Sequence, residues 1–340
     1  MAWRIVTTAT MGPHEGAITR LEAEGCVIDR LPADATAWTP ELIARFAPTA
    51  DAYVGTFRGV ALTRQVLEAS PRVRVATSPI IGVEHIDVAA ATDLGIVVTH
   101  GAIAENFEGM AEAGVMLIAA LRKALAGKVA SMGAGQWKAG PVGSMVAGAT
   151  IGLVGLGRIG RGVAKRLQGW DARIIAHDPY VTAAQAAEAG VGLVDFDTLF
   201  QQSDVVLTLV TLTPETHHIL GERALSLMKQ TASVINIGRG GCVDEAALVR
   251  ALDEGRIAGA AIDTWEVEPP PLDHPLRNHP KVIATSHNVG HSAELYDALP
   301  EAAAQSTLSA LRGEIPLYAR NPAVLPLWRE RIAAIEARYA

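Results

Sequence analysis

The sequence is poor in cysteine, in aromatic residues and in long apolar runs. Only two cysteines, Cys26 and Cys242, occur among 340 residues, which excludes a disulfide framework and a cysteine-rich zinc site. No uninterrupted apolar stretch reaches the roughly 18 residues of a membrane-spanning helix. The opening MAWRIVTTATMGP also lacks the apolar core of a secretory signal. We therefore expect a cytoplasmic protein with no membrane partner.

Positive charge is also in short supply. Lysine and arginine number 29 against 36 aspartates and glutamates, which gives a formal net charge of −7. This balance argues against a nucleic-acid partner held by a generally basic surface. Hydrophobic residues make up 49% of the chain, and its 340 residues are enough for two domains with a core each.

The first part of the chain alternates short valine- and isoleucine-rich runs with helical segments. This pattern predicts a parallel sheet covered on both faces. The predicted strands are 4–8, 52–57, 73–77 and 96–99, with helices at 40–46, 62–69 and 88–93. A longer apolar helix is predicted at about 106–125. The glycine-rich segment that follows, 127–149, is predicted to be a loop or docking arm.

A second series of the same kind begins at Thr150. Its predicted strands are 150–154, 172–176, 205–209, 233–237, 258–262 and 282–284. Six such strands form a complete doubly wound dinucleotide-binding sheet. The expected fold is therefore α/β with two doubly wound domains. A Rossmann NAD-binding domain spans 101–290, and a smaller flavodoxin-like substrate domain spans 1–100 and is completed by the mostly helical 291–340.

Gly155, Gly157 and Gly160 form a G-x-G-x-x-G motif between a predicted strand and a helix. Glycines there permit a tight turn, a close backbone approach to a pyrophosphate and close helix packing. Asp178 ends the next strand, where a carboxylate can bind both ribose hydroxyls and repel a 2′-phosphate. The motif therefore favours NAD over NADP. The alternative is that Asp178 only caps the turn before Pro179.

Three further segments place ionisable residues at strand ends: INIGRGGCVDEAAL, AIDTWEVEPPP and ATSHNVGHSAE. Ligands bind at this edge of open α/β sheets. Together with GVEHID, NFEGMAE, GLGRIG followed by DPY, and LTPET, these segments resemble the D-isomer-specific 2-hydroxyacid dehydrogenase family. The resemblance covers roughly residues 50–315. It implies an NAD-dependent enzyme that interconverts a 2-oxo acid and a D-2-hydroxy acid.

The resemblance assigns catalysis to three residues. Arg239 corresponds to the arginine whose planar guanidinium holds the substrate carboxylate and 2-oxo oxygen. His287 corresponds to the acid/base group, and Glu268 to the carboxylate that pairs with its ring and favours the imidazolium. A lone arginine or histidine at a strand end is usually structural, so the assignment depends on the three residues occurring together.

The resemblance implies NAD (NADH) as cofactor, a small-molecule 2-oxo or 2-hydroxy acid as substrate, and a homodimer docked through residues 120–147 with Trp137. No metal site is expected. The implied cofactor contacts are Gly155, Gly157, Arg158, Ile159, Gly160, Asp178, Thr216, Ile237, Gly238, Asp263 and Gly290. The implied substrate contacts are Ile81, Gly82, Asn106 and Arg239.

The chain departs from the family's pattern at several positions. Ser286 stands where a proline usually precedes the histidine of the S-H-N-V-G segment. Phe107, Glu108 and Met110 are unusual near the start of the long helix, and we expect them to face the region that sets substrate identity. The substrate is therefore not predicted by analogy.

Four residues have a less certain place in this scheme. His291 either reaches the active site or is structural at a hinge. Arg58 either meets a distal anionic group of the substrate or lies on the surface. Glu266 is expected to be solvated, and Cys242 is expected to be a packing residue.

Two other interpretations remain open. One is a non-enzymatic NAD-sensing scaffold, like the family's transcriptional corepressor relatives, which keep the fold and the NAD site. The other is a formate dehydrogenase, although that branch carries glutamine where this chain has Glu268. Turnover of NADH with a panel of 2-oxo acids distinguishes all three.

Overall fold

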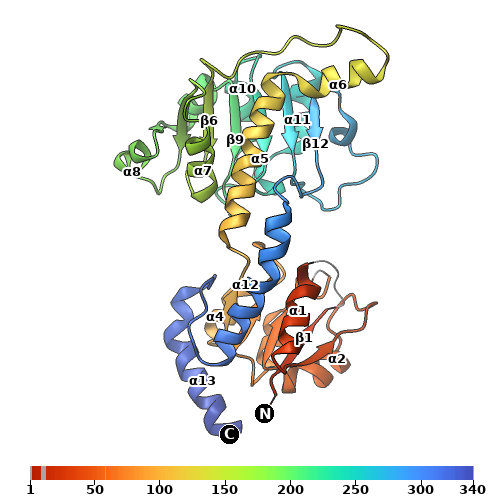
Figure 1. The fold of residues 1–340 in the computed structure, drawn as a ribbon, viewed down its shortest axis with the longest axis vertical. Helices are drawn as coiled ribbons and strands as arrows, with labels where there is room; N and C mark the ends of the chain where they lie inside the picture. The colour runs from red at the N-terminus through yellow and green to blue at the C-terminus, as the bar shows by residue number, and fades with distance from the viewer. Residues whose placement is uncertain (1, 9–12, 58, 340) are drawn as a thin grey trace. The chain divides into compact units, whose positions relative to one another are not determined.

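The computed structural model describes residues 2–8, 13–57 and 59–339. Arg58 lies outside the described residues. Contacts divide the chain into two compact units, and each is described by itself (Figure 1). Unit 1 combines Met1–Asn106 with Ser292–Ala340, and unit 2 is Phe107–His291. Unit 1 is therefore assembled from two separate stretches of chain.

Unit 1 is a parallel sheet in which five strands are seen among the described residues, in the order β2-β1-β3-β4-β5. This is the flavodoxin-like order expected of the smaller domain. The strands are β1 (Arg4–Thr7), β2 (Val27–Arg30), β3 (Ala52–Val54), β4 (Val75–Thr77) and β5 (Val97–Thr99). The helices are α1 (Pro13–Ala23), α2 (Pro40–Phe46), α3 (Arg64–Glu68), α4 (Val88–Asp93), α12 (Ala293–Leu311) and α13 (Leu325–Tyr339), with short 3₁₀ turns η1 (Ala47–Thr49) and η4 (Pro322–Val324).

Alternate residues of the unit 1 strands face opposite layers of helices, as pleated strands require. Ile5 and Val75 pack with α1, α12 and α13 in one buried cluster. Val6 and Ala76 pack with α2, α3 and α4 in the other. The stretch of chain after unit 2 thus supplies helices to one face of the unit 1 sheet.

Unit 2 holds a parallel sheet in the order β12-β11-β10-β9-β6-β7-β8 within the described chain. The strands are β6 (Thr150–Val154), β7 (Arg173–His177), β8 (Gly192–Leu193), β9 (Val205–Thr208), β10 (Ser233–Asn236), β11 (Gly259–Ile262) and β12 (Val282–Ala284). The helices are α5 (Ala104–Arg122, which begins in unit 1), α6 (Leu125–Gly133), α7 (Arg158–Arg166), α8 (Ala183–Glu188), α9 (Phe196–Gln202), α10 (Glu222–Leu227) and α11 (Glu245–Asp253), with turns η2 (Gly240–Cys242) and η3 (Pro275–Asn278).

The unit 2 sheet also buries both faces. Val205 and Ile235 belong to the cluster formed with α5, α7 and α8, whereas Val206 and Val234 belong to the cluster formed with α9, α10 and α11. The strand order reverses direction between β6 and β9, which is the switch point where doubly wound sheets bind dinucleotides. The predicted class, two doubly wound α/β units, is confirmed.

Three predicted features need correction. The sequence pattern did not reveal β2 and β8, so each sheet has one strand more than expected. Both strands are short, and β2 has two exposed and two half-exposed residues, so neither carries a buried valine-isoleucine run. The segment predicted as a loop or docking arm contains a helix, α6, none of whose residues is buried.

Over the described residues, no helix is both long and apolar enough to cross a membrane.

Candidate active site

The ionisable residues predicted as catalytic follow three neighbouring strands. β10, β11 and β12 are adjacent and parallel, in register from Asn236 through Ile262 to Ala284. Arg239, Asp263 and His287 come shortly after the last residues of these strands. The carboxyl ends of parallel strands meet at one edge of the sheet. The fold of unit 2 therefore gathers these residues at the edge where a ligand would bind.

Glu268 and His287 are in direct contact. Nδ1 of His287 lies 2.8 Å from Oε2 and 2.9 Å from Oε1 of Glu268. Their side chains are 40% and 29% exposed respectively, so the pair is held together and still open to an incoming molecule. A carboxylate only accepts hydrogen bonds, so Nδ1 carries a hydrogen and Nε2 is the ring nitrogen left for a second partner. This is the arrangement that a general acid requires.

Asp263 fixes the backbone that carries His287. It is 1% exposed, and its Oδ1 accepts hydrogen bonds from the Thr285 hydroxyl at 2.7 Å, from Asn288 N at 3.0 Å and from Val289 N at 3.1 Å. The N–H of His287 donates to the Asp263 carbonyl at 2.8 Å. Within the described part of the chain all side-chain contacts are on Oδ1, so Oδ2 remains available to an amide donor.

Arg239 lies in a turn stabilised by Asn236. The buried Asn236 side chain donates from Nδ2 to the Arg239 carbonyl at 3.0 Å and accepts from Gly238 N at 3.3 Å. Arg239 itself donates from Nη1 to the Gly238 carbonyl at 3.0 Å. The sequence reasoning missed Asn236 and Thr285, although both occur within the motifs it used.

The glycine turn after β6 has the geometry that a dinucleotide needs. Gly155 adopts a φ of +99°, and a Cβ at Gly160 would lie 2.7 Å from the Gly155 carbonyl oxygen. A Cβ at Gly157 would meet nothing within 4 Å. Gly157 is the N-cap of α7, and no side chain caps that helix end. The backbone N–H groups at the start of α7 are therefore left open to a ligand, which suits an anionic pyrophosphate.

Asp178 is tied to that turn. Its Oδ2 accepts from Leu156 N at 2.8 Å, and its Oδ1 accepts from Tyr180 N at 2.9 Å. Each carboxylate oxygen can accept a second hydrogen bond, so these contacts orient the group and leave acceptor sites for ribose hydroxyls. The two roles weighed for Asp178, turn cap and ribose ligand, are therefore compatible.

The unusual residues of α5 contact the phosphate-binding helix. The Arg158 guanidinium lies over the Phe107 ring, 4.7 Å from its centroid. Glu108 forms an ion pair with Arg166, which lowers the pKa of Glu108 through that hydrogen bond. The structure thus shows contacts from Phe107 and Glu108 to α7. That Phe107, Glu108 and Met110 face the region that sets substrate identity stays a prediction.

Other predicted cofactor contacts have structural roles of their own. The Thr216 hydroxyl donates to Thr211 O at 2.6 Å and accepts from Thr213 N at 2.7 Å. The Ile237 side chain is buried in the core. Gly290 packs against Met110, whose sulfur would lie 2.3 Å from an added Cβ. Ile159, half-buried in α7, packs on the same core.

The residues predicted to bind substrate through the backbone lie in unit 1. In the loop after β4, the Ser78 hydroxyl donates to Gly82 O at 2.7 Å, and Nδ1 of His100 lies 3.2 Å from Ile81 O. Asn106, in the first turns of α5, is the last residue of the first stretch of unit 1. These contacts fix the loop backbone within its own unit.

His291 is exposed and His287 is half-buried. Partial desolvation lowers the pKa of the His291 ring, an effect that Asp263 opposes and His287 reinforces. A histidine with a lowered pKa is neutral at pH 7, so it carries no imidazolium proton to donate. Cys242 is fully buried, and burial raises the pKa of its thiol. Such a thiol is inert, as expected of a packing residue.

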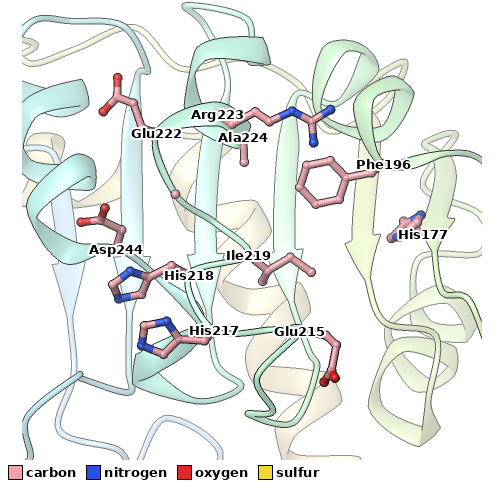
Figure 2. A pocket seen from close by; sticks show the side chains of 11 residues that line it. His177, Phe196, Glu215, His217, His218, Ile219, Glu222, Arg223, Ala224 and Asp244 are labelled. Carbon is pink, nitrogen blue, oxygen red and sulfur yellow. The ribbon is translucent and has the colours of Figure 1, made fainter.

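Figure 2 shows an open pocket of about 570 Å³ elsewhere in unit 2. His217 and His218 line it, with ring centroids 3.9 Å apart, together with Glu215 and Arg223. Glu266 is exposed, as expected, and it also pairs with His218. The described lining contains none of the three residues predicted as catalytic. Among the residues described, no cluster of three or more potential ligands could hold a metal ion.

A doubly wound sheet with a glycine turn at its switch point defines a dinucleotide-binding α/β protein. The model of the D-isomer specific 2-hydroxyacid dehydrogenase NAD-binding domain matches residues 115–289. This chain belongs to the D-isomer-specific 2-hydroxyacid dehydrogenase family, and unit 2 carries its NAD-binding domain.

Named relatives agree with this family. The chain is 39% identical over 269 residues to a glyoxylate reductase of Thermofilum pendens, covering 77% of this chain and 78% of that one. It is 37% identical over 304 residues to a D-3-phosphoglycerate dehydrogenase of Methanocaldococcus jannaschii, covering 89% and 56%. A solved glyoxylate reductase from Paecilomyes thermophila matches with a TM-score of 0.83 at 25% identity, covering 95% and 99%. The chain spans about half the length of the curated phosphoglycerate dehydrogenases that it matches.

Proposed function

We propose that this protein reduces a 2-oxo acid to a D-2-hydroxy acid, and catalyses the reverse reaction, with NAD(H) as cofactor. The contact of the His287 ring with the Glu268 carboxylate carries this proposal, because it pairs a proton donor with the anion that keeps it charged. Both lie at the sheet edge that also bears Arg239, a cation suited to a substrate carboxylate. When bound, the cofactor supplies the hydride.

The proposal gives each residue one task. His287 donates a proton from Nε2 to the substrate oxygen during reduction and recovers it during oxidation. Glu268 keeps that ring charged and oriented. Arg239 binds the carboxylate and the 2-oxo oxygen with two parallel N–H groups, and the backbone at Ile81 and Gly82, with Asn106, holds the rest of the substrate.

The cofactor residues divide into three groups along the edge of the unit 2 sheet. Gly155, Gly157, Arg158, Ile159 and Gly160 hold the pyrophosphate at the start of α7. Asp178 holds the adenosine ribose, and Thr216 lies along the adenosine half. The nicotinamide half is held by Ile237, Gly238, Asp263 and Gly290, with Oδ2 of Asp263 accepting from the carboxamide.

The decisive experiment is turnover. Purified protein should oxidise NADH in the presence of at least one acid from a panel of glyoxylate, pyruvate and longer or charged 2-oxo acids. Glycolate, the product from glyoxylate, is achiral, but chiral analysis of the product from pyruvate or a longer 2-oxo acid should give the D isomer. Tight NADH binding with no turnover across the panel would contradict the proposal and favour the non-enzymatic NAD-sensing scaffold.

We also propose a homodimer that buries the arm between α5 and β6. Val129, Met132, Trp137 and Met145 in this arm are between 61% and 77% exposed. Exposed apolar side chains gathered on one segment mark an interaction surface. Sedimentation of the wild type should give a dimer, and the double substitution Val129→Glu with Met132→Glu should give monomers. A monomeric wild type would contradict this assembly.

A further inference from the structure

The segment 264–268, which follows β11, connects the three strand-end loops of the candidate site. Glu268 Oε1 accepts from Trp265 N at 3.1 Å, so the carboxylate that faces His287 also closes its own loop. Trp265 is buried, and its Nε1–H donates to the Thr285 carbonyl at 2.9 Å, two residues before His287. The orientation of Glu268 therefore depends on where the Trp265 backbone lies.

The Trp265 backbone also packs against the loop after β10. A Cβ on Gly240 would lie 1.9 Å from the Trp265 carbonyl carbon, so only glycine fits beside Arg239. Movement of segment 264–268 would therefore alter its packing against both the loop after β10 and the loop after β12. The next question is which residues fix the backbone of this segment.

Glu245, the first residue of α11, is in the right place to do so. Its Oε1 accepts from Glu266 N at 3.0 Å, and its Oε2 lies 3.1 Å from Nε2 of His274. It is 7% exposed, and burial raises the pKa of its carboxyl. A glutamate that served only the helix dipole would lie in solvent. Burial at a desolvation cost, against the backbone of another loop, indicates a specific role.

The His274 ring completes the arrangement. Its Nδ1 accepts from Leu276 N at 3.3 Å, which leaves Nε2 as the donor to Glu245. The ring also meets Trp265 edge to face, with centroids 5.4 Å apart. The His274 ring thus contacts both the Glu245 carboxylate and the Trp265 side chain.

We propose that Glu245 and His274 are positioning residues, which hold the 264–268 segment so that Glu268 stays against the His287 ring. This inference rests on the proposed function for the roles of Glu268 and His287. Neither Glu245 nor His274 is assigned any contact with substrate or cofactor. Their effect passes through the Glu266 backbone and the Trp265 side chain.

The test is a comparison of Glu245→Ala, Glu245→Gln and wild type in steady-state reduction of the preferred 2-oxo acid. Glu245→Ala removes both contacts and should lower kcat roughly 10- to 100-fold through misplacement of the acid/base pair. KM for NADH should stay within about twofold of the wild type. Glu245→Gln keeps an acceptor for Glu266 N and should lie between the two.

Asp204→Ala is the matched control. Asp204 is also partly buried in unit 2 and likewise accepts one backbone N–H, from Thr150, and contacts one side chain, Lys229. It lies near the opposite end of the strands and has no contact with segment 264–268. Its replacement should lower the melting temperature while leaving kcat unchanged. If Glu245→Ala does not fold, Glu245→Gln alone decides, and a wild-type kcat in that variant would overturn the inference.

A second measurement does not depend on turnover. In NMR spectra of the cofactor-free protein, the ring signals of His287 should differ between Glu245→Ala and the wild type, because the ring loses its fixed contact with Glu268. The same signals should be unchanged in Asp204→Ala. An inactive wild type with displaced ring signals in Glu245→Ala would refute the proposed function alone. An active wild type with unchanged ring signals in Glu245→Ala would refute the positioning role alone.

Discussion

The sheets of unit 1 and unit 2 bury both faces by the same alternation of strand residues, yet their carboxyl edges differ. The loop after β4 in unit 1 offers backbone oxygens and the Ser78 hydroxyl, held by short-range contacts. The edge of unit 2 carries Arg239, Asp263 and His287. Hydrogen bonds to neighbouring loops fix Asp263 and His287, and Asn236 of the same loop fixes the Arg239 backbone. The common alternation decides the fold, whereas the residues just beyond each strand decide the chemistry.

The largest expected effect is a loss of turnover caused by a change in unit 2 that leaves the fold of unit 2 intact. His287→Ala should lower kcat roughly 10²- to 10⁴-fold while NADH binding stays near normal. His291→Ala should retain turnover within a few-fold, because partial desolvation disfavours the charged form of that ring. His287 has a φ of +56°, so His287→Asn, which tolerates this conformation, is the better-matched second variant. Loss of turnover in His291→Ala with His287→Ala active would move the acid/base role to His291.

The next largest effect is a loss of stability in unit 1 that leaves the proposed catalytic residues of unit 2 unchanged. Trp328 is fully buried among α12, α13 and the sheet, and its Nε1–H donates to Arg74 O at 2.9 Å. Trp328→Ala should cost about 3–5 kcal/mol of unfolding free energy, measured by urea denaturation followed by circular dichroism. Trp328→Phe keeps most of the packing and loses mainly one hydrogen bond, which costs about 1 kcal/mol. Both substitutions lie in unit 1, so NADH binding by unit 2 should persist in both variants before unit 2 itself unfolds in urea. Loss of NADH binding together with the unfolding of unit 1 would mean that the two units do not unfold independently.

A smaller effect concerns the choice of cofactor. The wild type should prefer NADH to NADPH strongly, because Asp178 would face a 2′-phosphate with like charge. Asp178→Asn keeps one acceptor for Leu156 N, which preserves the glycine turn. It should weaken NADH binding about 10-fold or more by removing charged hydrogen bonds and improve use of NADPH. Equal kcat/KM for the two cofactors in the wild type would remove Asp178 from the ribose site.

The smallest effect concerns the carboxylate beside the ring. Glu268→Gln keeps the size of the side chain and an oxygen that can accept from Trp265 N, but it removes the charged partner of the His287 ring. We expect kcat for reduction to fall about 10-fold or less while KM for NADH is unchanged, because only the acid/base pair is altered. Steady-state kinetics of both proteins measures the two constants. An unchanged kcat would show that the carboxylate does not act on the ring.

Most of the fold follows from the sequence because buried parallel strands are short, β-branched and bounded by turn residues. The strands that escaped detection are β2 and β8, at the edges of their sheets, where exposure removes the apolar signal. The helix α6 escaped because its glycines and small residues resemble those of a loop.

Some residues of the candidate site were predicted from the sequence, and others were not. Glycine spacing and the residues after each strand indicated Gly155, Asp178, Arg239 and His287 from the sequence. The supporting residues Glu245 and Asn236 were missed, because their partners are backbone groups that only the folded chain brings near them. No pattern of residue types along the chain encodes such a pairing.

Because unit 1 is built from two separate stretches of chain, the order of synthesis affects how the two units fold. Every strand and helix of unit 2 has been synthesised by the time the chain reaches His291, whereas unit 1 still lacks α12 and α13, which cover one face of its sheet. Domains generally fold as units as they emerge. The later-starting unit can therefore finish first, and Ile5, Val75 and Val97 in the β1–β5 segment can be covered only by α1 while unit 2 is translated. During that interval the nascent chain is most vulnerable to aggregation and most dependent on chaperones.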